Sequence, residues 1–332
     1  MIYDIGVIGT GPVGLFVPFI AGMKKLSCVM FESLGFVGGQ CSALYPEKPI
    51  YDIPALPKIT AGDLIQNLQE QIERFNPEIN LSESIVGFEK EGDIFLLKTS
   101  KDRTFKVRSI VIATGGGKFG PNRPPLENIE EFEEKSVFYS VLKKSDFAGK
   151  KIAIAGGGDS AVDWAISLSE VASKVYFVHR REKLKASPES IEILETLSKN
   201  GKLEFVIPFQ LEKLEGENGI LKNLVVSSLS GEMKSLEVDI LLPFFGLQTD
   251  SSLIKTFGIE IENGFAKVNQ TTMKTSIEGI YAVGDIAHYE NKLKLILSGF
   301  SEVATCVYDI KKFLKPSEVE HFEYSTTVFN KK

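Results

Sequence analysis

Three glycines near the start of the chain have the spacing of a dinucleotide-binding turn. Gly9, Gly11 and Gly14 form the pattern GxGxxG directly after an apolar run, residues 5–8, that is typical of a buried parallel strand. In such a turn the first glycine permits a tight bend, the second lets the backbone approach a pyrophosphate, and the third lets the next helix pack closely. Glu32 ends the second apolar run, about 20 residues further on, where a carboxylate accepts hydrogen bonds from an adenosine ribose. The alternative is a glycine-rich turn that binds nothing.

A second turn of the same kind lies in the middle of the chain. Gly156, Gly158 and Ala161 give the pattern GxGxxA after a predicted strand, residues 151–155. Because the helix N-terminus that follows such a turn presents free N–H groups and a partial positive charge, each turn is a candidate phosphate site. Two such turns predict two nucleotides.

The residues that follow the next predicted strand, 175–178, differ from those of the first unit. They are His179, Arg180 and Arg181, with no acid in the place that Glu32 holds. An arginine in this place suits the 2′-phosphate of NADP. The alternative is a basic turn that is simply solvated.

Length and composition are those of a globular protein with two cores. The chain has 332 residues, of which 43% are hydrophobic and 25% charged, and about 150 residues per domain predicts two domains. The net charge of −6 argues against a nucleic-acid partner. No apolar run approaches the 18 residues of a membrane span, and the N-terminal residues do not have the pattern of a signal peptide. We therefore expect no nucleic-acid partner and no membrane association.

The cysteines indicate the compartment. Cys28, Cys41 and Cys306 are far apart and form no CxxC pair. A sparse, odd number of cysteines is typical of a reducing environment, so we expect a cytoplasmic protein.

The elements that must position these residues follow from periodicity. A helix is predicted over residues 15–26, with a kink at Pro18, because a proline inside a helix removes one hydrogen bond. An irregular segment that begins at Gly38 is long enough to be a binding element. Thr60 caps a second amphipathic helix, and a third is predicted over residues 298–314.

Short strands separate these units. They are predicted at residues 79–81, 84–89, 94–99 and 104–107 as a meander, then at 110–115, and in the second unit at 203–209, 221–227 and 234–242. A proline-rich linker, residues 121–125, precedes the second unit, and Gly246 marks the return to the first. Residues 275–285 are predicted as a strand that ends in Asp285, and residues 324–332 as an ordered tail.

The sequence therefore predicts an α/β protein of two Rossmann-like dinucleotide-binding domains, the second inserted into the first. The expected boundaries are 1–118 for the first part of the first domain, 119–244 for the inserted domain and 245–332 for the second part of the first domain with the C-terminal segment.

At this point the chain resembles the two-dinucleotide-binding flavoproteins, of which thioredoxin reductase is a member. The motifs are GTGPVG with Glu32, ATG at 113–115, GGGDSA with HRR, and TSIEGIYAVGD. Thioredoxin reductase carries a CxxC before its second glycine motif, whereas residues 135–140 here are KSVFYS. The stretches GGQCSALYPEKPIYDIP and YSTTVF are similar to the thioredoxin-reductase-like ferredoxin–NADP⁺ reductases of bacteria.

The resemblance implies cofactors and contacts. FAD is expected in the first domain and NADP(H) in the second. The expected FAD contacts are Glu32 to the ribose, Gln40 and Tyr45 at the isoalloxazine, Ile85 at the adenine, Phe119 near the flavin, Asp285 to the ribityl chain, and Tyr324 and Thr326 from the tail. Lys185 stands where relatives often have an arginine beside the HRR.

The resemblance also implies an activity. NADPH would deliver a hydride to flavin N5, with a helix N-terminus near Ser298 facing the flavin, and electrons would pass singly to ferredoxin or flavodoxin. A homodimer is expected, and no catalytic side chain or metal is named. Two other functions stay open: a disulfide reductase that acts through Cys41, and a redox sensor that binds FAD and NADPH without passing electrons on.

Overall fold

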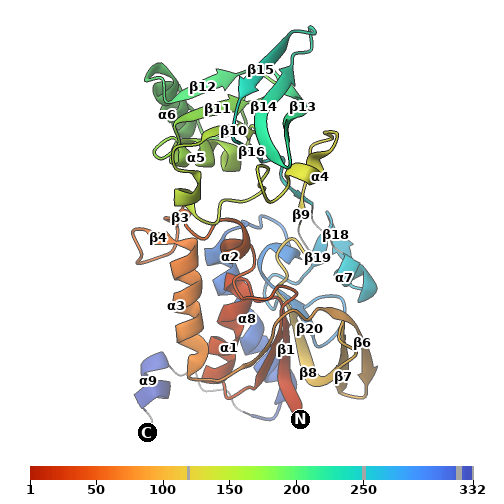
Figure 1. The fold of residues 1–332 in the computed structure, drawn as a ribbon. Coiled ribbons are helices and arrows are strands. Elements are labelled where there is room, and N and C mark those ends of the chain that lie inside the picture. The colour runs from red at the N-terminus through yellow and green to blue at the C-terminus, as the bar shows by residue number, and fades with distance from the viewer. Residues whose placement is uncertain (118–119, 249–251, 319–323, 331–332) are drawn as a thin grey trace. The chain divides into compact units, whose positions relative to one another are not determined.

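The computed structural model describes residues 1–117, 120–248, 252–318 and 324–330. The chain forms two compact units, residues 1–119 with 249–332, and residues 120–248. The main sheet of the first unit is mixed, and the second unit contains a parallel sheet; both units also contain helices (Figure 1). The predicted α/β fold class is confirmed.

The sheet of the first unit has the order β5-β2-β1-β8-β7-β6, and β20 pairs with β8. The strands are β1 (Ile2–Ile8), β2 (Cys28–Phe31), β5 (Glu78–Asn80), β6 (Ile85–Glu91), β7 (Ile94–Thr99), β8 (Thr104–Ile112) and β20 (Ile280–Ala282). Strand β1 is parallel to β2 and β8. The consecutive buried residues of β2 and of the second halves of β1 and β8 are typical of parallel strands that are covered on both faces. The two strands predicted at 104–107 and 110–115 are one strand, β8, since it pairs with β7 on one side and with β1 on the other.

Three long helices accompany this sheet: α1 (Pro12–Met23), α3 (Ala61–Glu73) and α8 (Ile296–Leu314). Pro18 is buried inside α1. The Thr60 cap is confirmed, because its side chain accepts a hydrogen bond from the Asp63 amide at 3.1 Å. Of the predicted strand 275–285 only β20 forms, and the 3₁₀ turn η2 (Gly284–Ile286) follows it.

The remaining elements of this unit are short. They are α2 (Gln40–Leu44), β3 (Pro49–Ile50), β4 (Ile59–Thr60), α7 (Ser252–Thr256), β18 (Ile261–Glu262), β19 (Phe265–Lys267), β21 (Ala287–His288) and α9 (Ser325–Asn330). Helix α2 lies in the segment predicted to be irregular, and α9 lies in the ordered tail.

The second unit has a four-stranded parallel sheet in the order β12-β11-β10-β16 and an antiparallel sheet, β13-β14-β15. Its elements are β9 (Gly120–Pro121), α4 (Ile129–Phe132), η1 (Lys144–Phe147), β10 (Lys151–Ala155), α5 (Asp159–Leu168), β11 (Lys174–Val178), α6 (Pro188–Lys199), β12 (Leu203–Val206), β13 (Gln210–Glu217), β14 (Ile220–Ser227), β15 (Met233–Glu237), β16 (Ile240–Pro243) and β17 (Leu247–Gln248).

The predictions for this unit were incomplete. Of the predicted strand 203–209 only β12 forms, and β13 was not predicted. The run 234–242 is two strands, β15 and β16, because its first half pairs with β14 and its second half with β10. Helix α6 was not predicted, although Ser187 caps it, with Pro188 at its first position.

Within the described ranges, no helix has both the length and the hydropathy that crossing a membrane requires.

Candidate functional site

A cavity of about 500 Å³ lies in the first unit where β1, β2, β8 and β20 end. Open α/β sheets bind ligands at the carboxyl ends of their strands, because turns and helix N-termini meet there. Seven of the residues predicted from the sequence line the cavity: Gly9, Gly11, Glu32, Gln40, Tyr45, Ile85 and Asp285. The fold therefore brings together residues that are up to 276 positions apart in the chain.

In the glycine turn of the first unit, Gly9 and Gly14 have no room for a side chain, whereas Gly11 has. A Cβ on Gly9 would lie 2.6 Å from the Ala113 carbonyl oxygen, and a Cβ on Gly14 would lie 2.0 Å from the Gly9 carbonyl oxygen. A Cβ on Gly11 would meet nothing within 4 Å. Gly11 caps α1, which has no side-chain cap and no acidic residue in its first turn. The turn therefore leaves an open cradle at a helix N-terminus, which fits a pyrophosphate.

Glu32 is held at the edge of the cavity. Its Oε2 accepts hydrogen bonds from the Thr10 amide at 3.0 Å and the Thr10 hydroxyl at 2.8 Å. Its Oε1 accepts from the Leu34 amide at 3.0 Å and the Ser33 hydroxyl at 3.1 Å. The two backbone amides fix the carboxylate, whereas the two hydroxyls can rotate away. Two hydrogen bonds are therefore available for exchange with a ribose diol.

Asp285, Tyr45 and Cys41 all line the cavity, and the Asp285 carboxylate interacts electrostatically with the other two. Burial raises the pKa of the Cys41 thiol to about 11, and the Asp285 carboxylate contributes to this shift. Burial, the neighbouring Cys41 and Asp285 likewise raise the pKa of the Tyr45 phenol. The Cys41 sulfur donates to the Tyr45 oxygen at 3.9 Å. In the described part of the chain the Asp285 carboxylate makes no hydrogen bond or ion pair, so it can accept one from a ligand.

Several lining residues were not predicted. Lys294, Leu295 and Ile296 line the cavity at the N-terminus of α8, which begins two residues before the predicted Ser298. Glu83 and Ser84 line it beside Ile85. The uncapped start of an amphipathic helix was the only sequence signal for the first group.

Four predicted residues of the first unit are not placed among those that line the cavity: Gly14, which packs against the Gly9 carbonyl, and three residues further along the chain. Phe119 lies outside the described residues. Tyr324 is 69% exposed, Thr326 is also exposed, and neither lines the cavity. In helix α9, the Phe329 ring lies 6.1 Å from the ring of Phe19 on α1. The roles of all three residues stay predictions.

The second unit brings its predicted residues together at the ends of β10 and β11. A Cβ on Gly156 would lie 2.7 Å from the Phe244 carbonyl oxygen, whereas one on Gly158 would meet nothing within 4 Å. The His179 ring covers Gly157, and the Lys185 amide donates to the Gly157 carbonyl at 2.7 Å. The basic turn that begins at His179 is thus hydrogen-bonded to the glycine turn.

The charges of this turn are available to a ligand. Arg180 and Arg181 are exposed, and across the described ranges neither pairs with a carboxylate. Burial lowers the pKa of His179, and the charges of the two arginines lower it further. A neutral imidazole beside two unpaired guanidinium groups fits an anionic ligand.

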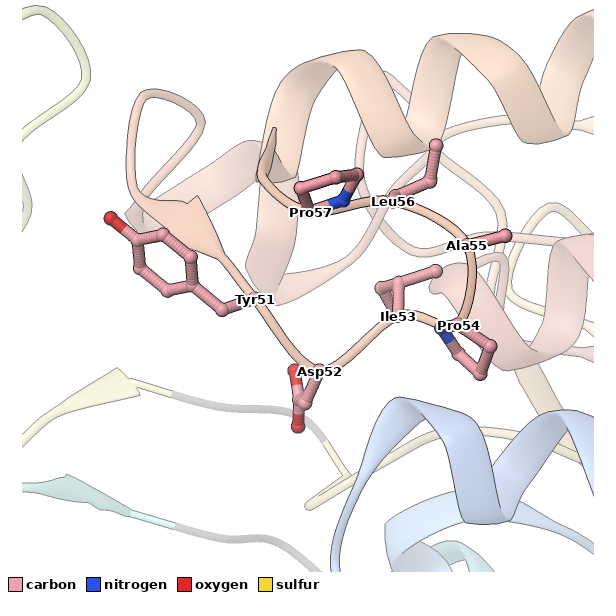
Figure 2. A pocket seen from close by; sticks show the side chains of 7 residues that line it. All are labelled: Tyr51, Asp52, Ile53, Pro54, Ala55, Leu56 and Pro57. Carbon is pink, nitrogen blue, oxygen red and sulfur yellow. The ribbon is translucent and has the colours of Figure 1, made fainter.

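A second hollow of the first unit carries no comparable chemistry. It has a volume of about 470 Å³ and is lined by a single loop, residues 51–57 (Figure 2). Asp52 is its only charged lining residue, and Tyr51 is 64% exposed. Nor do the described residues contain a cluster of three potential metal ligands.

All three cysteines are buried and free. We expect native protein at pH 8 to resist alkylation by iodoacetamide, since a thiol of pKa about 11 is only about 0.1% thiolate at that pH, and Cys41 is 1% exposed. Mass spectrometry of native and urea-unfolded samples checks this. Rapid labelling of Cys41 in the native protein would contradict the geometry, whereas all three should react after unfolding.

The chain is similar to known proteins over nearly its full length. The family model for pyridine nucleotide-disulphide oxidoreductases matches residues 3–303. A ferredoxin–NADP reductase of Rickettsia akari (strain Hartford) is 50% identical over 329 residues, 99% of this chain and 98% of the relative. One of Rickettsia canadensis (strain McKiel) is 51% identical over 328 residues, 99% of this chain and 97% of the relative.

Solved structures are similar over the same length. Lactococcus lactis thioredoxin reductase has a TM-score of 0.79 at 26% identity, covering 95% of this chain and 99% of that one. T. acidophilum thioredoxin reductase has a TM-score of 0.80 at 19% identity, covering 94% and 99%, which supports the fold alone.

Proposed function

The chain belongs to the pyridine nucleotide-disulphide oxidoreductase family, and from that premise we propose that it is a ferredoxin–NADP⁺ reductase with FAD in its first unit and NADP(H) in its second. The observation that supports this most strongly is the identity of about half of all residues, over nearly the full length, to ferredoxin–NADP reductases.

The first unit has the groups that FAD requires. The cradle at Gly11 and the N-terminus of α1 would bind the pyrophosphate, Glu32 the ribose, Asp285 a ribityl hydroxyl, and Tyr45 would lie against the isoalloxazine. When bound, FAD supplies the conversion between hydride and single-electron transfer, which side chains cannot perform. The chain's own residues bind the cofactor and orient it.

The second unit has the groups that NADP(H) requires. Gly156 allows the tight packing of the turn, Gly158 leaves it open to a pyrophosphate, and Arg180 and Arg181 would bind the 2′-phosphate. Charge-assisted hydrogen bonds to a phosphate are the strong ones, because both partners are charged.

A disulfide substrate does not suit this chain. Where thioredoxin reductase has its CxxC, Ser136 is 4% exposed. Its hydroxyl donates to the Gly219 carbonyl at 2.9 Å and accepts from the Leu221 amide at 3.1 Å. Such a serine is structural. Cys41 has no second cysteine beside it, and its raised pKa makes it a poor nucleophile.

The proposed partners are ferredoxin, or flavodoxin in its place, and a second copy of the chain in a cytoplasmic homodimer. Tyr324 is exposed and does not line the cavity. Its proposed role at the flavin therefore needs further structure around this residue.

The experiment that tests the proposal is anaerobic reduction of ferredoxin by NADPH with FAD-reconstituted protein. We expect ferredoxin reduction that depends on both the protein and NADPH. Binding of both cofactors without electron transfer would instead favour a redox sensor, and reduction of thioredoxin would favour a disulfide reductase.

Replacing Asp285 with alanine should weaken FAD binding by about tenfold or more, because a hydrogen bond to a charged group contributes about 1.5–3 kcal/mol. The measurement is titration of apoprotein with FAD, followed by the loss of flavin fluorescence. Unchanged affinity would remove Asp285 from the site. A wild-type protein that takes up no FAD would contradict the proposed function itself.

A further inference from the structure

A buried ion pair lies directly behind the cavity of the first unit. Glu302 on α8 is 4% exposed, and the side chain of Lys292, whose ammonium group it contacts, is 3% exposed. The same carboxylate accepts a hydrogen bond from the Tyr289 hydroxyl at 2.8 Å and from the Gly284 amide at 2.7 Å. Neither Glu302 nor Lys292 lines the cavity.

The partners of Glu302 belong to two segments of the cavity wall. Gly284 begins η2 and precedes Asp285, and Tyr289 and Lys292 lead into the lining residues 294–296. Glu302 therefore connects the turn that carries Asp285 to the segment that enters α8.

The same helix also reaches the glycine turn. A Cβ on Gly299, three residues before Glu302, would lie 2.3 Å from Cγ2 of Val13. Val13 is on α1 and lines the cavity. The first two turns of α8 thus contact three parts of the wall: the turn at Asp285, the segment 294–296 and the start of α1.

A buried ion pair of this kind contributes little to stability by itself, since desolvation of the two charges opposes their attraction. Removal of one partner is costly, because the other charge is left buried, and here the Gly284 amide would also lose its acceptor. The position of the Asp285 turn is therefore coupled to the presence of the Glu302 carboxylate.

We propose that Glu302, with Lys292 and Tyr289, is a positioning residue that holds Asp285 and the entry to α8 in the geometry that binds FAD. This inference rests on the proposed function of the same cavity. Glu302 acts through Asp285 and does not itself touch the ligand.

The chain offers a matched control on the same helix. Asp309 accepts a hydrogen bond from the Tyr281 hydroxyl at 2.8 Å and pairs with Lys274 at 2.9 Å. Its partners are again one tyrosine and one lysine, but none of these three residues lines the cavity. Asp309→Asn therefore removes a charge from α8 away from the residues that line the cavity. The side chains of this pair are 39% and 17% exposed, so its stability cost is smaller than that of Glu302→Gln.

The test is a double-mutant cycle on FAD affinity, measured by fluorescence titration of apoprotein. Glu302→Gln should weaken FAD binding by about 10-fold to 100-fold, the size that supporting residues have at metal sites. In the Asp285→Ala background the same substitution should weaken FAD binding at most slightly further, because the effects of substitutions at coupled residues are not additive. Asp309→Asn should leave the affinity within about twofold, since distant sites act independently.

A merely structural role would give a different pattern. Additive effects of Glu302→Gln and Asp285→Ala, or equal losses of affinity in Glu302→Gln and Asp309→Asn, would overturn the proposal. If Glu302→Gln does not fold, Tyr289→Phe removes one hydrogen bond and should show the same coupling with a loss of about 2-fold to 10-fold. Failure of the wild-type protein to bind FAD would instead contradict the proposed function.

Discussion

Replacing Arg180 and Arg181 together with alanine should lower the preference for NADPH over NADH by about 10²-fold to 10⁴-fold. Each charge-assisted hydrogen bond to the 2′-phosphate contributes about 1.5–3 kcal/mol, so two give about 3–6 kcal/mol at most. Both side chains are exposed and lack a carboxylate partner across the described ranges, so neither must give up an internal ion pair. The effect should fall on NADPH, because NADH has no 2′-phosphate.

The measurement is kcat/KM for both cofactors in the wild type, in each single variant and in the double variant. Lys199→Ala with Lys202→Ala removes two exposed positive charges from the same unit, on α6 and before β12, and serves as the control for net charge. The control should keep the wild-type preference. A wild-type protein with equal kcat/KM for the two cofactors would refute the role of the basic turn.

Gly11→Asp should weaken FAD binding by at least about 10²-fold, because it places a carboxylate in the cradle where a pyrophosphate would lose several charge-assisted hydrogen bonds. The fold should tolerate it. A Cβ on Gly11 meets nothing within 4 Å, its φ is −62°, and aspartate is a favoured helix N-cap. Gly11→Ser adds a side chain without charge and should have a smaller effect.

Gly14→Ala, in contrast to Gly11→Asp, should destabilise the fold. Its Cβ would collide with the Gly9 carbonyl oxygen at 2.0 Å, so we expect a loss of about 1–3 kcal/mol in the free energy of unfolding. Urea unfolding of apoprotein and FAD titration separate the two variants. Gly11→Asp that unfolds as easily as Gly14→Ala, or that binds FAD like the wild type, would show that the open cradle is not the pyrophosphate site.

Residues in local motifs were predictable from the sequence. The roles of Gly9, Gly11 and Glu32 were predicted from a strand–turn–helix pattern. This pattern is local, because its chemistry depends on backbone groups that are close in the sequence. Asp285 and Tyr45 came from the resemblance, and the structure places both in the cavity with them.

Features that depend on tertiary pairing were not predictable. Strand β8 was divided in two, because its two neighbours lie elsewhere in the chain. Lys294 and Glu83 reach the cavity only through the packing of α8 and β6. Glu302 and Lys292 are charged residues that composition alone would assign to the solvent. Their side chains are buried because they contact each other and because Glu302 also accepts hydrogen bonds from Tyr289 and Gly284.

The most direct test of the proposed activity is an electron count with all cysteines removed. Cys28→Ser, Cys41→Ser and Cys306→Ser are combined, and the FAD-loaded variant is mixed anaerobically with NADPH, ferredoxin and, separately, thioredoxin. We expect the free energy of unfolding to fall by about 1–3 kcal/mol for each buried hydroxyl, so activity is expressed per bound FAD. A ferredoxin–NADP⁺ reductase should reduce two ferredoxin molecules for each NADPH oxidised and should not reduce thioredoxin. Loss of ferredoxin reduction with FAD retained, or rapid thioredoxin reduction by the wild-type protein, would contradict this function.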